Sequence, residues 1–239
     1  MMKKLAFGLL AVMSIAIISC LNDDGYSLND QWVGFGMIQE NAGVRLIKMD
    51  DGVILRPVAW ENGLNYGDDF DNGSRLLINF TVLDEIKNND GTVNQYQVKI
   101  NDASEVLLKG IFRLTEENAD SIGNDPIIVQ EHWMTDSLIN FKLKYWGYNK
   151  THFLNLVQET EEPVLEEPIK LELRHNANED EEALSYTAFV SFSLNKLRIA
   201  GKDSITVEIS STGYEGVTHT FQEVFNYKDL PYDDPLEQE

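Results

Sequence analysis

The chain has 239 residues, of which 40 are acidic and 19 are basic, so its formal charge at pH 7 is −21. Proteins bind nucleic acids and anionic lipid surfaces largely through lysine and arginine, so this charge balance disfavours both as partners. Cys20 is the only cysteine, which excludes a disulfide within the chain. The stability of the folded part must therefore come from packing.

The first 19 residues have the pattern of an export signal. Lys3 and Lys4 precede an apolar run over residues 5–18, and Ser19 is the small residue expected before a cleavage point. The run is shorter than the roughly 20 residues that cross a bilayer, and acidic residues follow it where a stop-transfer helix would carry lysine or arginine. We expect residues 1–19 to be removed, and the loss of two lysines takes the charge to −23.

The last residues of this signal, Ile17, Ile18, Ser19 and Cys20, resemble the lipobox of bacterial lipoproteins, in which the cysteine is lipidated and becomes the mature N-terminus. Cys20 is thus the predicted lipidation site, with palmitate among its acyl chains. Residues 20–30 are polar and small, as in a flexible tether. Asp23 and Asp24 also resemble the acidic signals that route some lipoproteins to the cell surface. The predicted location is the outer membrane, with exposure at the surface or in the periplasm left open.

Residues 31–114 are predicted to form a first domain of short strands. Apolar residues alternate with polar ones or form short runs, which is typical of strands. We expect strands over residues 32–39, 44–49, 53–59, 75–83, 96–100 and 106–114. Asp-Gly pairs at Gly52 and Gly91 predict type I′ hairpin turns. Short strands without helical crossovers favour a small antiparallel barrel or sandwich.

The polar segment 115–124 is the predicted boundary between two domains. It is long enough for one helical turn and shows no face for a core. Seven further strands are expected in a second domain, residues 125–239, over residues 127–133, 141–146, 153–158, 169–174, 187–194, 205–210 and 217–227. Strict alternation, as in Ile169-Lys170-Leu171-Glu172-Leu173, gives each strand one apolar and one polar face. This pattern predicts an antiparallel β-sandwich.

Several of these segments together resemble the NigD-like lipoproteins of Gram-negative bacteria. They are Cys20, the pair Asp23-Asp24, and residues 53–57, 73–80 and 171–177, and the resemblance covers nearly the whole mature chain. The resemblance implies an N-terminal OB-like barrel followed by a C-terminal β-sandwich. It also implies the role in bacteriocin immunity that has been proposed for the family, but it carries no catalytic signature and assigns no residue to that role.

No catalytic or metal-binding motif stands out. His132, His152, His175 and His219 are not spaced as a zinc pair, and His219 is expected to be a wall or surface residue. The sequence lacks a Gly-x-Ser-x-Gly elbow, a glycine-rich phosphate loop and a cysteine nucleophile. Residues 68–73 and 178–182 are acidic but fit solvated turns better than calcium loops. With 40 acidic residues, pairs of carboxylates carry no information about glycosidase activity.

Two other features bear on function. Aromatic side chains that could stack on sugars if they were exposed are Trp32, Trp60, Tyr66, Trp133, Trp146 and Tyr148. Three Asp-Ser-aliphatic tripeptides, at Ser121, Ser137 and Ser204, resemble an O-glycosylation motif of some Gram-negative anaerobes, although Asp before Ser is also a common turn choice.

We therefore interpret the chain as a non-catalytic, lipid-anchored envelope protein without a cofactor. It would act by binding, either as a bacteriocin-immunity factor or as a subunit of a surface assembly. The alternative is a surface module that binds glycans. The residues that bind the partner cannot be named from the sequence, and nucleic acid is not an expected partner.

Overall fold

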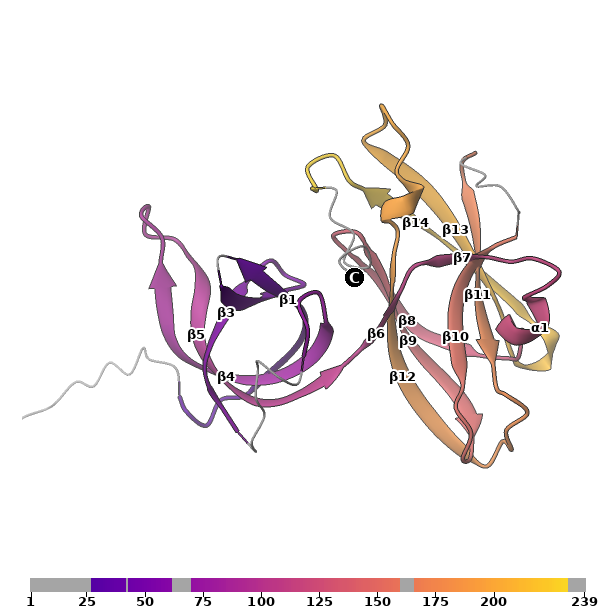
Figure 1. Cartoon of the computed structure of the whole chain (residues 1–239), viewed down its shortest axis with the longest axis horizontal. Coiled ribbons are helices and arrows are strands. Elements are labelled where there is room, and N and C mark those ends of the chain that lie inside the picture. Colours follow the sequence, from indigo (N-terminus) through magenta and orange to yellow (C-terminus); the bar gives the residue numbers. More distant parts are fainter. Residues whose placement is uncertain (1–26, 42, 62–69, 160–165, 232–239) are drawn as a thin grey trace, which may run out of the picture.

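The computed structural model describes residues 27–41, 43–61, 70–159 and 166–231. Figure 1 shows two β-sheet bodies side by side, a barrel from the first five strands and a sandwich from the rest. The predicted all-β fold with an OB-like barrel and a sandwich is confirmed. The predicted signal peptide and Cys20 lie outside the described residues. Within the described ranges, no helix has the length and apolar character needed to cross a membrane.

The barrel is closed, with strands in the order β1-β2-β3-β5-β4 and β1 pairing with β4. Strands β3 and β5 run parallel, and the other neighbours are antiparallel. The bounds are β1 (Trp32–Asn41), β2 (Val44–Met49), β3 (Ile54–Trp60), β4 (Arg75–Lys87) and β5 (Val93–Glu105).

Successive side chains of a strand point to opposite faces, and this alternation determines which of them fill the barrel. In β4, Leu76, Ile78, Phe80 and Val82 point inward and are buried in one cluster with residues of the other strands. Strand β1 passes close to β2 at Gly36, where a Cβ atom would lie 2.7 Å from Cγ2 of Ile47. Only glycine allows this approach without displacing the core.

The turns at Gly52 and Gly91 are present but differ in type from the prediction. Each glycine has a positive φ, +86° at Gly52 and +83° at Gly91, and its N–H donates to the carbonyl three residues earlier. The residues between have negative φ, whereas a type I′ turn needs two positive values. Each loop is therefore a type I turn followed by a left-handed glycine, a pattern that Asp-Gly also supports.

The sandwich consists of two facing sheets. One has the order β14-β13-β11-β10-β7 and the other the order β6-β12-β9-β8. The seven predicted strands correspond to β8 (Ile128–Thr135), β9 (Leu138–Gly147), β10 (Phe153–Gln158), β11 (Ile169–Asn176), β12 (Leu184–Ser193), β13 (Ser204–Thr212) and β14 (Thr218–Asn226). Their inward side chains, with Phe141 and Phe192 at the centre, form a second buried cluster.

The predicted strand over residues 106–114 is not part of the barrel. It is two short strands, β6 (Leu107–Lys109) and β7 (Ile111–Arg113), that run parallel to β12 and β10 respectively. The chain thus passes from barrel to sandwich at Val106, earlier than the predicted boundary at 115–124. Alternation in this segment correctly indicates strands, but it does not show which neighbours they join.

The segment between β7 and β8 contains a single helical turn, α1 (Ala119–Ile122), as predicted. The expectation that it has no core face is wrong, because Ile122 is buried. Two 3-10 turns, η1 (Asn195–Leu197) and η2 (Tyr214–Gly216), complete the structure.

Candidate functional site: the groove between barrel and sandwich

A buried ion pair lies where the barrel meets the sandwich. Arg75 begins β4, its side chain is 1% exposed, and its Nη1 and Nη2 atoms both bind the carboxylate of Asp50, the latter at 2.6 Å. The same guanidinium reaches the sandwich, where Nη2 donates to Oδ1 of Asn140 at 3.1 Å and Nε to Oγ of Ser191 at 3.3 Å. One barrel side chain thereby contacts strands β9 and β12.

The sandwich also supplies donors to Asp50. Oγ1 of Thr135 donates to Oδ2 of Asp50 at 3.1 Å, and Nε1 of Trp133 lies 3.4 Å from the same oxygen. Asn140 is held in turn by Ser191, whose hydroxyl donates to its Oδ1 at 2.6 Å. A buried ion pair is tolerated when its remaining hydrogen-bonding positions are filled, and these neighbours fill them.

Phe35 covers the ion pair from the barrel side. Its ring centroid lies 5.3 Å from that of Trp133 and 5.1 Å from that of Phe189, both in the sandwich. The guanidinium carbon of Arg75 lies 5.5 Å from the Phe35 ring centroid, within cation–π range. Aromatic packing around a charge pair excludes water, so these contacts fix the barrel against the sandwich.

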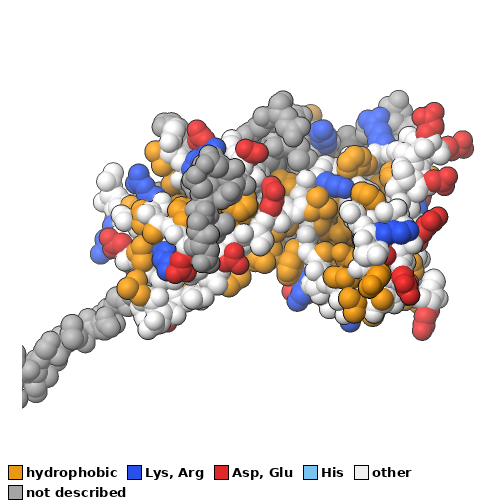
Figure 2. Space-filling model, turned by 60° about the horizontal axis from the view of Figure 1, so that its bottom comes forward, with side chains coloured by type: hydrophobic (Ala, Val, Ile, Leu, Met, Phe, Trp, Pro, Cys, Tyr) orange, Lys and Arg blue, Asp and Glu red, His pale blue; other side chains and the backbone are white. Residues whose placement is uncertain are grey.

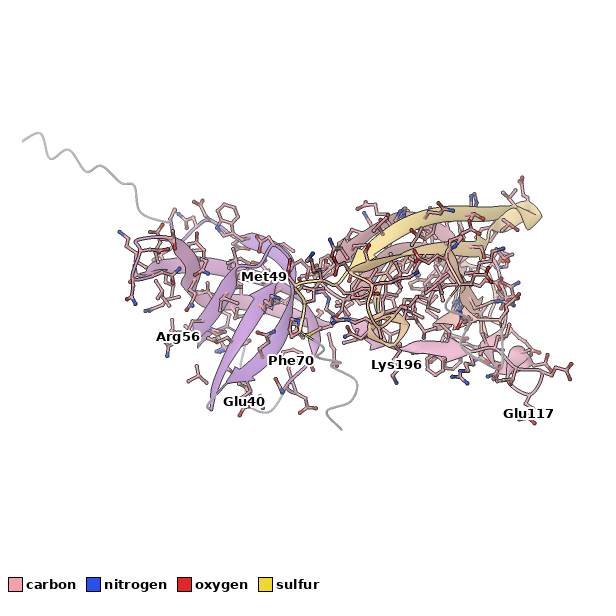
Figure 3. The ribbon with its side chains drawn as sticks, turned by 90° about the horizontal axis from the view of Figure 1, so that it is seen from above. Glu40, Met49, Arg56, Phe70, Glu117 and Lys196 are labelled. Atoms are coloured by element: carbon pink, nitrogen blue, oxygen red, sulfur yellow. The ribbon has the colours of Figure 1, made fainter. Side chains whose placement is uncertain are left out.

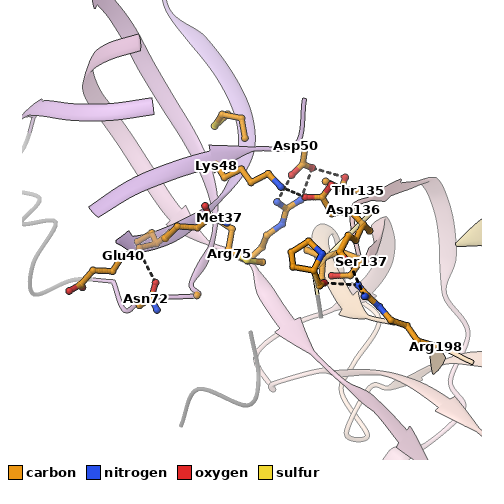
Figure 4. A pocket seen from close by; sticks show the side chains of 17 residues that line it. Met37, Glu40, Lys48, Asp50, Asn72, Arg75, Thr135, Asp136, Ser137 and Arg198 are labelled. Atoms are coloured by element: carbon orange, nitrogen blue, oxygen red, sulfur yellow. Dashed lines mark hydrogen bonds and ion pairs between the residues drawn. The ribbon is translucent and has the colours of Figure 1, made fainter. Parts of the chain in front are cut away.

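Beside this junction is a groove of about 350 Å³. Figure 4 shows that both bodies line it, and in Figure 3 Met49 lies beside the junction of barrel and sandwich. Its apolar lining comes from Met37, Met49, Leu138, Leu230 and Pro231. Its charged lining comes from Glu40, Lys48, Asp50, Arg75, Asp136 and Arg198.

Two charged contacts organise the groove. Nζ of Lys48 in the barrel pairs with Asp136 of the β8–β9 turn, so this ion pair joins the two bodies at the surface. Arg198 donates from Nη1 to the carbonyl of Leu230 at 3.1 Å and from Nη2 to that of Pro231 at 3.0 Å. Arg198 therefore holds the chain after β14 against the groove wall.

Ser137, one of the predicted glycosylation sites, also lines the groove and accepts a hydrogen bond from Nδ2 of Asn195 at 3.2 Å. Ser121 is exposed and donates to the carbonyl of Asn118, whereas Ser204 begins β13 and is partly buried. The three predicted serines therefore lie in different settings, and glycosylation of each remains a prediction.

The structure brings together two of the four histidines at the far end of the sandwich. Nδ1 of His152 lies 2.8 Å from Nε2 of His175, and Nε2 of His152 lies 3.2 Å from Oδ2 of Asp180. Nδ1 of His175 donates to the carbonyl of Pro126 at 3.0 Å. Tyr145 stacks on His152 with centroids 4.7 Å apart.

The donors and acceptors in these contacts show which ring nitrogen of His175 carries its proton. A carbonyl only accepts, so His175 carries its proton on Nδ1, and its Nε2 accepts from Nδ1 of His152. The backbone N–H of Tyr148 holds the pKa of Asp180 well below its usual range, so the Asp180 carboxylate acts as an acceptor in its contacts. Burial lowers the pKa of His175, which agrees with its neutral form.

The other two histidines are separate. His132 of β8 stacks on Phe221 of β14 with centroids 4.1 Å apart, and its Nε2 lies 3.0 Å from Glu223. His219 is exposed, which confirms its predicted position at the surface. Within the described ranges, no group of three His, Cys, Asp or Glu side chains is arranged to hold a metal ion.

The acidic segments behave as turns where they are described. Residues 68 and 69 lie outside the described residues, but Asn72 accepts the N–H of Glu40 at 2.9 Å and the segment leads into β4. Asp180, in the loop before β12, accepts hydrogen bonds from the N–H groups of Tyr148 and Asn149 at 2.5 and 3.2 Å, so it holds that loop against the loop after β9.

Two carboxylates do lie close together, because they share one arginine. Glu159 and Glu172 both bind Nη2 of Arg174, at 3.1 and 2.7 Å, beside a cavity of about 530 Å³. Burial raises the pKa of Glu172. The described residues lining this cavity include no aromatic side chain, so it offers no platform on which a sugar ring could stack.

The aromatic residues predicted to bind sugars do not gather on one face. Trp32 is 51% exposed on the barrel and Tyr148 is 55% exposed on the sandwich. Trp133 is packed against Phe35 at the junction, and Trp146 contacts Tyr214 and Lys144. Trp60 is half-buried, and Tyr66 lies outside the described residues.

The groove was not predicted from the sequence. Arg75 and Asp50 lie at the ends of predicted strands, where charged residues are usually exposed. The histidine pair could have been found. His152 directly precedes one predicted strand and His175 follows the next, and consecutive antiparallel strands place such ends together, as the pairing of Leu154 with His175 shows.

The fold places the protein in the class of all-β proteins that consist of a closed five-stranded barrel followed by a nine-stranded sandwich. Residues 110–223 match the family model of the NigD-like C-terminal beta sandwich domain. The sandwich therefore belongs to the family of NigD-like C-terminal domains, which supports the NigD-like resemblance stated from the sequence. No curated protein matches the chain.

Three solved structures are similar over most of the chain. A "Putative TOXIN related protein" from Parabacteroides distasonis is 25% identical, with a TM-score of 0.67, over 83% of this chain and 94% of the other. A NigD-like immunity protein from Bacteroides caccae is 18% identical, with a TM-score of 0.58, over 83% and 99%. A "Putative lipoprotein" from Bacteroides fragilis is 14% identical, with a TM-score of 0.57, over 84% and 100%.

Proposed function

We propose that this protein is a lipid-anchored, non-catalytic component of the bacterial envelope that binds a segment of another protein in the groove between barrel and sandwich. The groove itself is the observation that carries the proposal. It lies between two bodies, which is a common place for binding sites, and a buried ion pair keeps its walls fixed.

The lining of the groove favours a polypeptide as the occupant. Lys48 and Asp136 place both signs of charge at its edge, which suits the mixed charges and amides of a peptide better than a uniformly charged ligand. Met37 and Met49 supply flexible apolar surface that adapts to different side chains. A partner would gain affinity from the apolar lining and orientation from the charges.

The location rests on the sequence and on the names of similar structures. The export signal and the lipobox at Cys20 support a lipid anchor, and Asp23-Asp24 supports transport to the outer membrane surface. A similar fold is described as a "Putative lipoprotein". Another is called a NigD-like immunity protein, which supports immunity against a bacteriocin as the specific role, with a surface assembly as the alternative.

Site-specific photo-crosslinking in the native bacterium tests the groove. Benzoylphenylalanine would replace Gln39, an exposed groove residue, and in a matched strain Glu117, an exposed residue at the far end of the sandwich (Figure 3). We expect ultraviolet light to join one defined protein to position 39 and not to position 117. Equal products at the two positions, or none at position 39, would contradict the proposal.

A further inference from the structure

Within the described residues, the sandwich has one long and regular edge strand. Strand β14 ends the sheet β14-β13-β11-β10-β7 and pairs with β13 over its nine residues without a register shift. The other edges of the sandwich are the three-residue strands β6 and β7, and β8, whose pairing shifts between Val129 and Glu131. Short strands, bulges, proline and lysine protect natural sheet edges from pairing with another chain. Strand β14 contains neither proline nor lysine, so its edge has none of these protections.

The backbone of β14 leaves every second residue open to a further strand. The N–H of Gly213 donates to the carbonyl of Val217, and the pairing continues in register from there. Hydrogen-bonded residues alternate with non-hydrogen-bonded ones in an antiparallel pair, so the odd-numbered residues of β14 bond to β13. The N–H and C=O groups of Thr220, Gln222 and Val224 therefore point outward. They have no hydrogen-bond partner among the described residues.

We propose that β14 pairs antiparallel with β14 of a second copy of this chain, so that two five-stranded sheets become one continuous sheet. The outward bonds must join even-numbered residues, and overlap of the whole nine-residue strand centres the pair on Gln222. Gln222 then faces Gln222 of the second copy. Such a two-fold contact uses the same surface on both copies and closes on itself, which is the commonest arrangement of homodimers.

The side chains along this edge suit a second copy. The outer row is exposed and uncharged, and it consists of Thr218, Thr220, Gln222, Val224 and Asn226. In the proposed register Thr220 lies opposite Val224 of the second copy, and β-branched side chains pack well against their cross-strand neighbours. The contact also covers Val224, which is 60% exposed in a single copy.

The acidic residue of β14 does not face another carboxylate in this register. Glu223 lies opposite Phe221 of the second copy, because the pair centres on Gln222. Its Oε1 atom lies 3.0 Å from Nε2 of His132 in its own copy. A pair centred on Glu223 would instead place two carboxylates opposite each other, and like charges in that position destabilise a strand pair. The charges therefore favour the register centred on Gln222 over that one.

The net charge of −21 opposes association of two copies, but its distribution reduces the repulsion. Figure 2 shows acidic side chains gathered at the end of the sandwich that faces away from the barrel. Strand β14 begins near that end, since Tyr214 just before it lines a cavity with Asp120 and Glu182, and it ends toward Leu230 in the groove. Antiparallel pairing therefore separates the two acidic ends. At physiological ionic strength, charges more than about 8 Å apart are largely screened.

Cysteine cross-linking tests the pairing and its register. The full chain carrying Cys20→Ala has no native thiol, so Gln222→Cys, Thr220→Cys or Val224→Cys introduced into it gives one thiol per copy. In the proposed pair the two Cα atoms at position 222 lie about 5.5 Å apart, which suits a disulfide. The two Cα atoms at position 220, or at position 224, lie four residues apart along the strands, about 14 Å, which is too far.

Under mild oxidation with copper phenanthroline, we expect Gln222→Cys to give at least about tenfold more linked dimer than Thr220→Cys or Val224→Cys alone. A mixture of Thr220→Cys and Val224→Cys chains should also link, because these positions face each other. The variants are matched, since all three positions are exposed on the same edge. Equal linking in the three variants, linking of Thr220→Cys or Val224→Cys alone, or no linking of Gln222→Cys would overturn the proposal.

Sedimentation velocity tests the pairing without a cross-link. Gln222→Pro removes the outward N–H of residue 222 and keeps the bonds to β13, since proline is tolerated on an edge whose N–H faces solvent. Gln222→Ala is the control, because both variants lose the side-chain bond to Glu208 at 2.8 Å. We expect dimers for Cys20→Ala with or without Gln222→Ala, and a monomer when Gln222→Pro is added. Monomers throughout, or an unchanged dimer with Gln222→Pro, would overturn the proposal. Circular dichroism shows whether each variant is folded, and the cross-linking result decides if Gln222→Pro is not.

Discussion

Nη2 of Arg75 lies 3.1 Å from Oδ1 of Asn140, and this hydrogen bond joins the first residue of β4 in the barrel to the beginning of β9 in the sandwich. Asn140 is 1% exposed and Arg75 is 2% exposed. A charged group this deeply buried must keep all its partners, so the contact makes the position of the barrel part of the internal packing of the sandwich.

The replacement Arg75→Met should strongly destabilise the protein, because it leaves the carboxylate of Asp50 without its counter-charge. Removing one member of a buried ion pair costs about 3–5 kcal/mol. Urea denaturation followed by fluorescence measures the loss. The matched control is Arg56→Met, an exposed arginine of β3, for which we expect a change within about 0.5 kcal/mol.

The double variant Arg75→Met, Asp50→Leu should recover part of the stability lost in Arg75→Met, because no unpaired charge then remains. Recovery will be incomplete, since Thr135 and Trp133 lose their acceptor. A double variant less stable than Arg75→Met would show that the ion pair is not the source of the loss.

The ion pair between Lys48 and Asp136 should contribute little, although it also joins the two bodies. Its side chains are 35% and 46% exposed, and exposed pairs contribute below about 1 kcal/mol. A double-mutant cycle with Lys48→Ala and Asp136→Ala measures the coupling energy directly. A coupling as large as that expected for Arg75 would mean that the groove edge is less accessible to water than these exposures indicate.

His175 should make stability depend on pH. Burial lowers the pKa of His175 in the folded protein below the ordinary value of 6.5, so the unfolded chain binds more protons between these two values. Stability therefore falls as the pH drops through 6.5 toward the folded pKa, by at most about 1.4 kcal/mol per pH unit for one proton.

Urea midpoints at pH 8 and pH 5 test this dependence. His175→Gln should lower stability at both values but reduce the difference between them. The control His219→Gln removes an exposed histidine and should leave the difference unchanged. An unchanged difference in His175→Gln would assign the pH response to other groups.

Cys20→Ala should abolish acyl labelling and move the protein from the membrane fraction to the soluble fraction. Each buried CH₂ of an acyl chain contributes about 0.8 kcal/mol to anchoring, so loss of the chains removes the main attachment. Metabolic labelling with a fatty-acid analogue and cell fractionation measure the two effects. An alanine variant that stays in the membrane fraction in high salt would contradict the lipid anchor.

Much of the fold could be predicted because alternation of apolar and polar residues reports burial directly. The strand beginning at Ile169 is an example, since every second side chain is in the core. The residues 106–114 show the limit of this signal. Alternation shows which face of a strand is buried, but it does not show which strand lies next to it. Strands β6 and β7 pair with strands of two different sheets.

The groove could not be predicted for a related reason. Asp50 and Arg75 lie 25 residues apart, each at the end of a strand, where charged residues are usually exposed. Only the docking of the sandwich on this side of the barrel buries them. Sequence patterns within one body contain no information about the surface that the other body will cover.

The passage from barrel to sandwich, with only Gly110 between β6 and β7, has a mechanical consequence. Strand β6 pairs in parallel with β12 of one sheet, and strand β7 pairs in parallel with β10 of the other sheet. A pulling force that enters through the barrel therefore loads the two sheets together. Rupture requires shearing both ladders at once instead of peeling one strand at a time.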